Sequence, residues 1–141
     1  MNLWQRVQNL FGGEKSAPPL PPNAPIENDE PEIVVPEISV EQLQAALADS
    51  QPPAGIPLVI DVREPYEWRL VRMTAAHHIP MNEIPALLDS IPHDRPVVVM
   101  CAHGSRSYSV AAWLIEQGVD ASSLAGGITQ WANRGGAVEQ G

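Results

Sequence analysis

Cysteine is almost absent from this chain, which carries one, Cys101, among its 141 residues. A single cysteine excludes a disulfide bond within the chain. A free thiol is best kept in a reducing compartment, so we expect a cytoplasmic protein. The length is sufficient for one domain with an appendage.

Basic residues are also scarce, because eight lysines and arginines stand against seventeen acidic residues and give a net charge of -9. Nucleic-acid phosphates attract lysine and arginine, so nonspecific nucleic-acid binding is not expected. No apolar run approaches the roughly 18 residues of a membrane span, and the first residues lack the basic start and long apolar core of a secretory signal. We therefore expect neither a membrane-spanning segment nor a secretory signal.

The first thirteen residues place Leu3, Val7 and Leu10 at helical spacing, followed by two glycines. This pattern predicts a short amphipathic helix over 1–13 that packs on its own domain or docks a partner protein. Membrane contact is not expected, since the polar face holds one arginine and no lysine. Residues 14–36 are rich in proline and acidic residues, which predicts an extended linker.

The remaining residues, 37–141, alternate apolar runs with helical patterns. Ser39 and Gln42 have the spacing of a capping box, and Asn82 is expected to cap a helix that runs to Leu88. Short apolar runs at 58–60, 97–100 and 122–124 predict strands. Such alternation predicts an α/β fold: an open parallel sheet of about five strands with helices on both faces.

Cys101 follows the buried-strand pattern of residues 96–100 and opens the loop CAHGSRS, after which a helical pattern begins. A loop between a strand and a helix can turn its backbone N–H groups inward, where they and the helix dipole stabilise an anion. The same field lowers the pKa of a thiol. We therefore interpret Cys101 as a reactive thiolate, although a lone cysteine after a strand can also be a small buried apolar residue.

Three segments together resemble the rhodanese domain of the single-domain sulfurtransferase type. Residues 61–68 (DVREPYEW) are similar to the family's D-V-R-E-P-x-E-Y/W. Residues 101–107 (CAHGSRS) are similar to its C-x-x-G-x-R-S, and residues 124–131 (LAGGITQW) to its L-x-G-G-I/M-x-x-W. The resemblance covers roughly 37–135 and implies a rhodanese-like fold. The family's G-H-I-P-G-A is replaced by VRMTAA at 71–76, so Val71 requires either a rebuilt turn or a strained backbone.

The resemblance implies that Cys101 takes a sulfane sulfur from a donor such as thiosulfate, becomes a persulfide and passes the sulfur to a thiophilic acceptor. The implied substrate-binding residues are Ala102, His103, Gly104, Ser105, Arg106 and Ser107, whose N–H groups would hold the anion. Arg106 is expected to attract an anionic donor, while His103 is either a second cation or a plain exposed loop residue.

Asp61 is either a support for the loop from the neighbouring strand or a simple strand-terminal acid. Arg63 and Glu64 are expected to form structural ion pairs. No cofactor is implied, and His77 and His78 do not predict a metal site, because adjacent side chains diverge. The expected partners are a small sulfur donor and a protein that accepts sulfur or docks on residues 1–13.

Two other functions remain open. A cysteine phosphatase uses a similar anion cradle, but it has five residues between cysteine and arginine, and this chain has four. The second alternative is a noncatalytic or redox-sensing module that binds a protein. Retention of Cys101, Gly104 and Arg106 argues against it, and the altered 71–76 segment argues for it.

Overall fold

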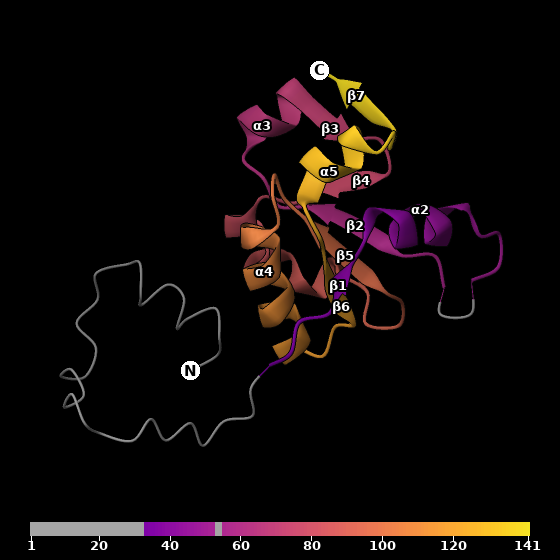
Figure 1. Cartoon of the computed structure of the whole chain (residues 1–141). Helices are drawn as coiled ribbons and strands as arrows, with labels where there is room; N and C mark the ends of the chain where they lie inside the picture. The colour runs from indigo at the N-terminus through magenta and orange to yellow at the C-terminus, as the bar shows by residue number, and fades with distance from the viewer. Residues whose placement is uncertain (1–32, 53–54) are drawn as a thin grey trace, which may run out of the picture.

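Five parallel strands form the main sheet of the computed structural model, which describes residues 33–52 and 55–141. Their order is β1-β6-β5-β2-β4 (Figure 1). The strands are β1 (Glu37–Ile38), β2 (Leu58–Asp61), β4 (Ala76–His78), β5 (Val97–Met100) and β6 (Ala121–Leu124). The predicted α/β fold, an open parallel sheet with about five strands, is confirmed.

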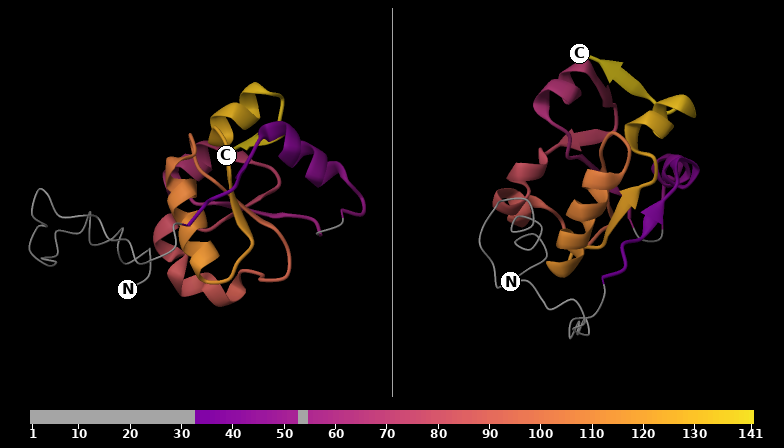
Figure 2. Two further views of the ribbon diagram at one scale, coloured as in Figure 1. Left: turned by 60° about the horizontal axis from the view of Figure 1, so that its bottom comes forward. Right: turned by 60° about the vertical axis from the view of Figure 1, so that its left-hand side comes forward.

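Helices cover both faces of this sheet, as predicted (Figures 1 and 2). Helix α4 (Ser105–Glu116) covers one face, and α2 (Val40–Ala48) and α5 (Gly127–Asn133) cover the other. Helix α3 (Pro65–Leu70) has no buried residue and lies at the end of the sheet (Figure 1). Successive residues of β5 point to opposite faces, so Val97 and Val99 pack in the cluster that contains α4. Val98 and Met100 pack in the second cluster, with residues of α2 and α5. Because both faces are covered, the whole of β5 is buried, which explains its continuous apolar run.

The capping box predicted at the start of α2 is present. The Ser39 hydroxyl accepts a hydrogen bond from the Gln42 backbone N–H at 3.1 Å, and the Gln42 side chain accepts one from the Ser39 N–H at 2.9 Å. These two bonds satisfy donors that a helix start otherwise leaves unpaired. They fix the point at which the chain leaves β1.

The prediction of one helix capped by Asn82 and running to Leu88 is wrong. The chain instead forms two 3-10 helices, η1 (Met81–Glu83) and η2 (Pro85–Ser90). Pro85 has no backbone N–H to bond to an Asn82 cap or to continue an α-helical ladder. The Ile84 N–H bonds to the Met81 carbonyl three residues back, as in a 3-10 helix.

The altered segment 71–76 contains a strand that the sequence did not predict. Strand β3 (Val71–Met73) pairs antiparallel with β7 (Val138–Gln140) as a separate two-stranded sheet. Val71 is extended, with φ -155° and ψ 140°. Among the described residues, positive φ angles occur at glycines alone. Of the two alternatives stated for Val71, the structure shows a rebuilt segment without backbone strain.

The described chain is already packed before the predicted domain start at residue 37. Val35 is buried in the α4-side cluster, and the Pro36 carbonyl accepts a 2.9 Å hydrogen bond from the Ser123 N–H. The predicted helix over 1–13 and most of the linker 14–36 lie outside the described residues, so they stay predictions. In the described part of the chain, no helix has the length and apolar character to cross a membrane.

Candidate active site

Cys101 directly follows β5, at the edge of the sheet where the parallel strands end. Four residues later α4 begins at Ser105, with Gly104 as its N-cap. Gly104 has φ 115°, a left-handed backbone conformation that favours glycine, and this turn brings the loop back over the sulfur. The predicted arrangement of strand, short loop and helix is therefore present around the thiol.

The sulfur of Cys101 is buried among hydrogen-bond donors. The residue is 1% exposed, and Sγ accepts bonds from the N–H groups of Gly104 at 3.1 Å and Ser107 at 3.5 Å. Burial raises the pKa of the Cys101 thiol, but hydrogen bonds from the Ser107 hydroxyl and from the N–H groups of Ser107, Gly104 and His103 outweigh it. The net pKa is lowered, which favours the thiolate.

Ser107 connects the sulfur to the core. Its hydroxyl lies 3.5 Å from Cys101 Sγ, donates to the Gly104 carbonyl at 3.0 Å, and lies 2.8 Å from the Ser123 hydroxyl. Ser107 and Ser123 are both buried. Ser123 was not among the predicted site residues. A hydroxyl at an inward position of β6 was the available signal, because strand alternation places Ser123 on the face covered by α4.

The start of α5 is hydrogen-bonded to the first residues of the loop. The N–H groups of Ile128 and Thr129 donate to the carbonyls of Cys101 and Ala102, at 2.9 and 3.3 Å. A Cβ at Gly127 would overlap both of these carbonyl groups. The double glycine of the third motif thus permits a close approach between the helix start and the loop, and this leaves the loop's N–H groups turned toward the sulfur.

Arg106 is tied to an acidic residue that the sequence analysis did not assign to the site. Its two terminal nitrogens donate to the Glu67 carboxylate at 2.7 and 3.0 Å, and Glu67 also accepts from the Glu64 N–H at 3.1 Å. The hydrogen bond from Arg106 lowers the pKa of Glu67 to about 2. Arg106 is therefore ion-paired in this structure, and its attraction of an anionic donor stays a prediction. The position of Glu67 inside the first motif was the available signal.

The carboxylate of Asp61 bonds to Arg63 rather than to the loop. Its buried carboxylate accepts hydrogen bonds from the Arg63 guanidinium at 2.8 to 3.1 Å and from the Arg63 N–H at 2.9 Å. Arg63 in turn donates to the carbonyls of Val71, at 2.7 Å, and Glu67, at 3.5 Å. Asp61 therefore supports α3, and α3 holds Arg106 through Glu67. The ion pair expected for Arg63 is present as a buried pair; Glu64 contributes its backbone N–H.

The side chains of the other predicted loop residues have no hydrogen bond to the sulfur. His103 is exposed, with Nδ1 3.4 Å from the Thr129 hydroxyl. Ser105 is exposed too, and its carbonyl accepts a 3.5 Å bond from the Ser109 hydroxyl. Ala102 contributes the carbonyl that bonds to α5. Within the described ranges there is no group of three histidine, cysteine, aspartate or glutamate side chains arranged to hold a metal ion.

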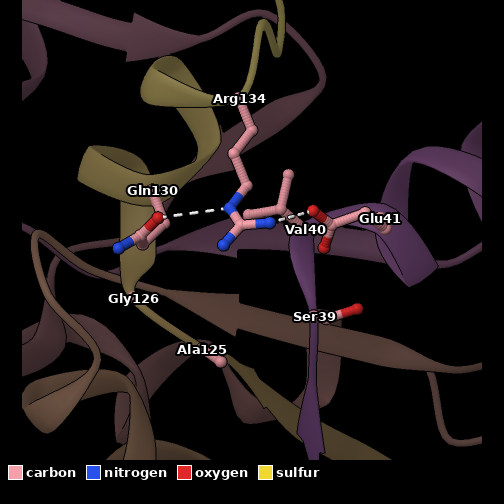
Figure 3. Close-up of a pocket in the computed structure, with 7 residues that line it drawn as sticks. All are labelled: Ser39, Val40, Glu41, Ala125, Gly126, Gln130 and Arg134. Carbon is pink, nitrogen blue, oxygen red and sulfur yellow. Dashed lines mark hydrogen bonds and ion pairs between the residues drawn. The ribbon is translucent and has the colours of Figure 1, made fainter.

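A pocket of about 250 Å³ lies between α2 and α5, at the ends of β1 and β6 (Figure 3). Arg134 and Glu41 form an exposed ion pair across it, and Arg134 Nε also donates to Gln130 Oε1 at 3.3 Å. Cys101 does not line this pocket. Since its two charges neutralise each other, the pocket offers no free charge for binding an ion.

The sequence model of the Rhodanese-like domain family matches residues 39–134, most of the described chain. This chain belongs to the rhodanese-like domain family. A sulfurtransferase of Allochromatium vinosum is 39% identical over 103 residues, covering 72% of this chain and 92% of that protein. The thiosulfate sulfurtransferase GlpE of Pseudomonas fluorescens is 36% identical over 75 residues, which cover 52% of this chain and 69% of the GlpE chain.

Solved structures agree with the fold. The rhodanese-like domain protein of Staphylococcus aureus has a TM-score of 0.66 and 30% identity, over 76% of this chain and 99% of that one. A rhodanese-related protein of Thermoplasma volcanium has a TM-score of 0.65 and 27% identity, over 75% of this chain and 99% of its own. The rhodanese resemblance carried by the three motifs is therefore confirmed at the level of family and fold.

Proposed function

We propose that this protein is a sulfurtransferase in which Cys101 carries the transferred sulfur as a persulfide. The observation that supports this most is the set of donors around one buried sulfur: the Gly104 N–H at 3.1 Å, and the Ser107 N–H and hydroxyl at 3.5 Å. Such fixed donors stabilise an anionic sulfur without reorganisation during the reaction. The names of the relatives from Allochromatium vinosum and Pseudomonas fluorescens support the same activity.

The reaction needs no cofactor, because cysteine itself forms the covalent intermediate. The Cys101 thiolate attacks the outer sulfur of thiosulfate, the S–S bond of the donor breaks, and sulfite leaves with its electron pair. The enzyme then holds Cys101–S–S⁻. A thiophilic acceptor such as cyanide attacks the outer sulfur, which leaves as thiocyanate and regenerates the thiolate.

Burial of Cys101 restricts the donor and the acceptor. Since 1% of the residue is exposed, a bulky group cannot reach the sulfur without movement of the loop. This favours a small donor such as thiosulfate, and it favours an acceptor that presents a narrow nucleophile, as a small molecule or as the thiol of a partner protein. We keep the cytoplasm, a docking role for residues 1–13 and the absence of nucleic-acid binding as parts of this proposal.

The loop length argues against a phosphatase, because four residues lie between Cys101 and Arg106 where a phosphatase has five. The pairing of Arg106 with Glu67, together with the burial of Cys101, favours the second candidate function, a noncatalytic or redox-sensing module. The two candidates differ in whether Cys101 gains a sulfur atom.

Intact mass spectrometry after incubation with thiosulfate tests the proposal. We expect wild-type protein to gain about 32 mass units, reversed by a reductant and by cyanide, with thiocyanate released in the second case. The matched control is Cys101→Ser, which should gain nothing. Folded wild-type protein with a reduced thiol that gains no mass from several sulfane donors would overturn the proposal and support the noncatalytic module.

A further inference from the structure

Ser123 is a buried polar residue in an apolar setting. It is 1% exposed, and it lies on β6 beside Val99 of β5, on the face that packs against α4. Its hydroxyl lies 2.8 Å from the hydroxyl of Ser107, and either oxygen can be the donor. An apolar side chain of similar size would fill this position without the need for a hydrogen-bond partner, so the hydroxyl calls for an explanation.

The explanation comes from counting protons at Ser107. Its hydroxyl has one proton and can accept bonds on its two lone pairs. While Cys101 is a thiol, its S–H donates to Ser107 Oγ, and Ser107 donates to the Gly104 carbonyl at 3.0 Å. A thiolate or a persulfide can only accept. In that state Ser107 stabilises the sulfur by turning its single proton from Gly104 to Sγ.

Two contacts make this rotation possible. The Gly104 carbonyl keeps a second donor, the Tyr108 N–H at 3.1 Å, so it is not left unpaired when the Ser107 proton turns away. Ser123 donates its own proton to Ser107 Oγ in both states, because the one proton of Ser107 goes to Gly104 or to the sulfur. The three groups form a chain of hydrogen bonds in one direction, from Ser123 to Ser107 to the sulfur, and each bond polarises the next.

We propose that Ser123 is a positioning residue for Cys101: its hydroxyl donates to Ser107 and thereby directs the Ser107 proton to the sulfur whenever the sulfur is anionic. Neither serine takes up the thiol proton, which leaves to solvent; only hydroxyl orientations change. The consequence for sulfur transfer rests on the proposed function. The effect on the thiolate itself does not.

The charged groups near the sulfur limit what else controls its ionisation. His103 and Arg106 lie on the loop, and Glu67 on α3 is paired with Arg106. The Asp61–Arg63 pair lies at the end of β2. Strand β6 and helix α5 carry no titratable side chain in their sequences. Substitution of Ser123 therefore removes a hydrogen bond without removing a charge.

The experiment measures the rate of Cys101 alkylation by iodoacetamide against pH, which gives the thiol pKa whether or not the protein transfers sulfur. We expect Ser123→Ala to raise this pKa by about half a unit to one unit, as loss of one neutral hydrogen bond implies. Below the pKa, alkylation should slow by about threefold to tenfold. Ser123→Thr, which keeps the hydroxyl, should retain the wild-type value.

Ser122→Ala is the matched control, because Ser122 is the preceding residue of β6 and points to the opposite face of the sheet. Circular dichroism checks the fold of each variant, and Ser123→Val gives a second way to remove the hydroxyl. A Ser107→Ala variant should raise the pKa further, and adding Ser123→Ala to it should change nothing more. An unchanged pKa in folded Ser123→Ala, or additive shifts in the double variant, would overturn the proposal.

If alkylation behaves as expected but no variant or wild-type protein gains sulfur from thiosulfate, the role of Ser123 stands and the proposed sulfurtransferase activity fails. If wild-type protein gains sulfur and Ser123→Ala alkylates as wild type does, the activity stands and the role of Ser123 fails. The two readouts thus separate the two proposals.

Discussion

Glu67 on α3 and Arg106 in the first turn of α4 are joined by two hydrogen bonds, of 2.7 and 3.0 Å, between segments 39 residues apart in sequence. The pair fixes the start of α4, and therefore the N–H groups around Cys101, relative to α3. It also raises the pKa of Arg106, because the hydrogen bonds to Glu67 stabilise the charged guanidinium. The pair contributes order to the loop rather than a free charge.

Acid should weaken the fold through this pair. The pKa of Glu67 is lowered from 4.5 to about 2 by the hydrogen bond from Arg106. Between these values the unfolded chain holds a proton that the folded protein does not, so the free energy of unfolding falls as the pH drops from about 4.5 to about 2. Allowing for partial exposure, we expect a loss of about 1 to 2 kcal/mol, measured by urea denaturation at several pH values.

Glu67→Gln should show a smaller loss over the same pH range, because the titrating group is gone. Glu83→Gln is the control, since Glu83 is exposed on η1, and it should follow the wild-type curve. An equal acid loss in wild type and Glu67→Gln would show that other carboxylates control the acid stability.

The buried pair of Asp61 and Arg63 should matter more for stability than the exposed pair of Glu41 and Arg134. The side chains of the first pair are 0% and 3% exposed, and those of the second 58% and 55%. Asp61→Asn leaves the Arg63 charge buried without its partner, and we expect a loss of about 3 kcal/mol or more in urea denaturation. Arg134→Ala should cost less than about 1 kcal/mol.

The expectation for Asp61 would fail if both variants unfolded at the same urea concentration. The alkylation rate of Cys101 shows whether the loss of Asp61 also disturbs the active-site loop. Because Asp61 supports α3 through Arg63, Asp61→Asn should also slow alkylation of Cys101 by disturbing the Glu67–Arg106 pair, while Arg134→Ala should leave the alkylation rate unchanged.

The features predicted correctly from sequence are those that neighbouring residues determine. The capping box of Ser39 and Gln42 and the loop between β5 and α4 each depend on residues within one or two turns of the chain. The error at Asn82 has the same local origin: a good capping residue was given more weight than Pro85, which removes a donor that the helix needs.

The features that were missed join segments far apart in the chain. Arg72 and Glu139, paired across β3 and β7, are 67 residues apart, and Ser107 and Ser123 are 16 apart. No local pattern marks either partner, because the contact exists only once the strands and helices have packed. Glu67 is the intermediate case. Its motif was recognised, but its partner Arg106 could be identified only from the structure.

Truncation tests how much of the chain before residue 37 the fold needs. A protein that starts at Ile33 should fold and keep the alkylation rate of Cys101. A protein that starts at Ser39 loses β1 and the buried side chain of Val35, which contributes about 1.5 to 3 kcal/mol. We expect the shorter protein to unfold at a clearly lower temperature, measured by circular dichroism. Equal melting temperatures would show that residues 33–38 are not needed by the core.

Gly127→Ala should disrupt the site, because its Cβ would overlap the carbonyls of Cys101 and Ala102. Gly135→Ala is a matched control: the two glycines have φ values of 60° and 81°, but a Cβ at Gly135 meets nothing within 4 Å. The control should lose about 1 to 2 kcal/mol of stability from the left-handed backbone alone. Gly127→Ala should lose more in urea denaturation and should also raise the pKa of Cys101, since the loop must move off α5. If the two variants lose equal stability and alkylate equally fast, the contact between α5 and the loop does not position the sulfur.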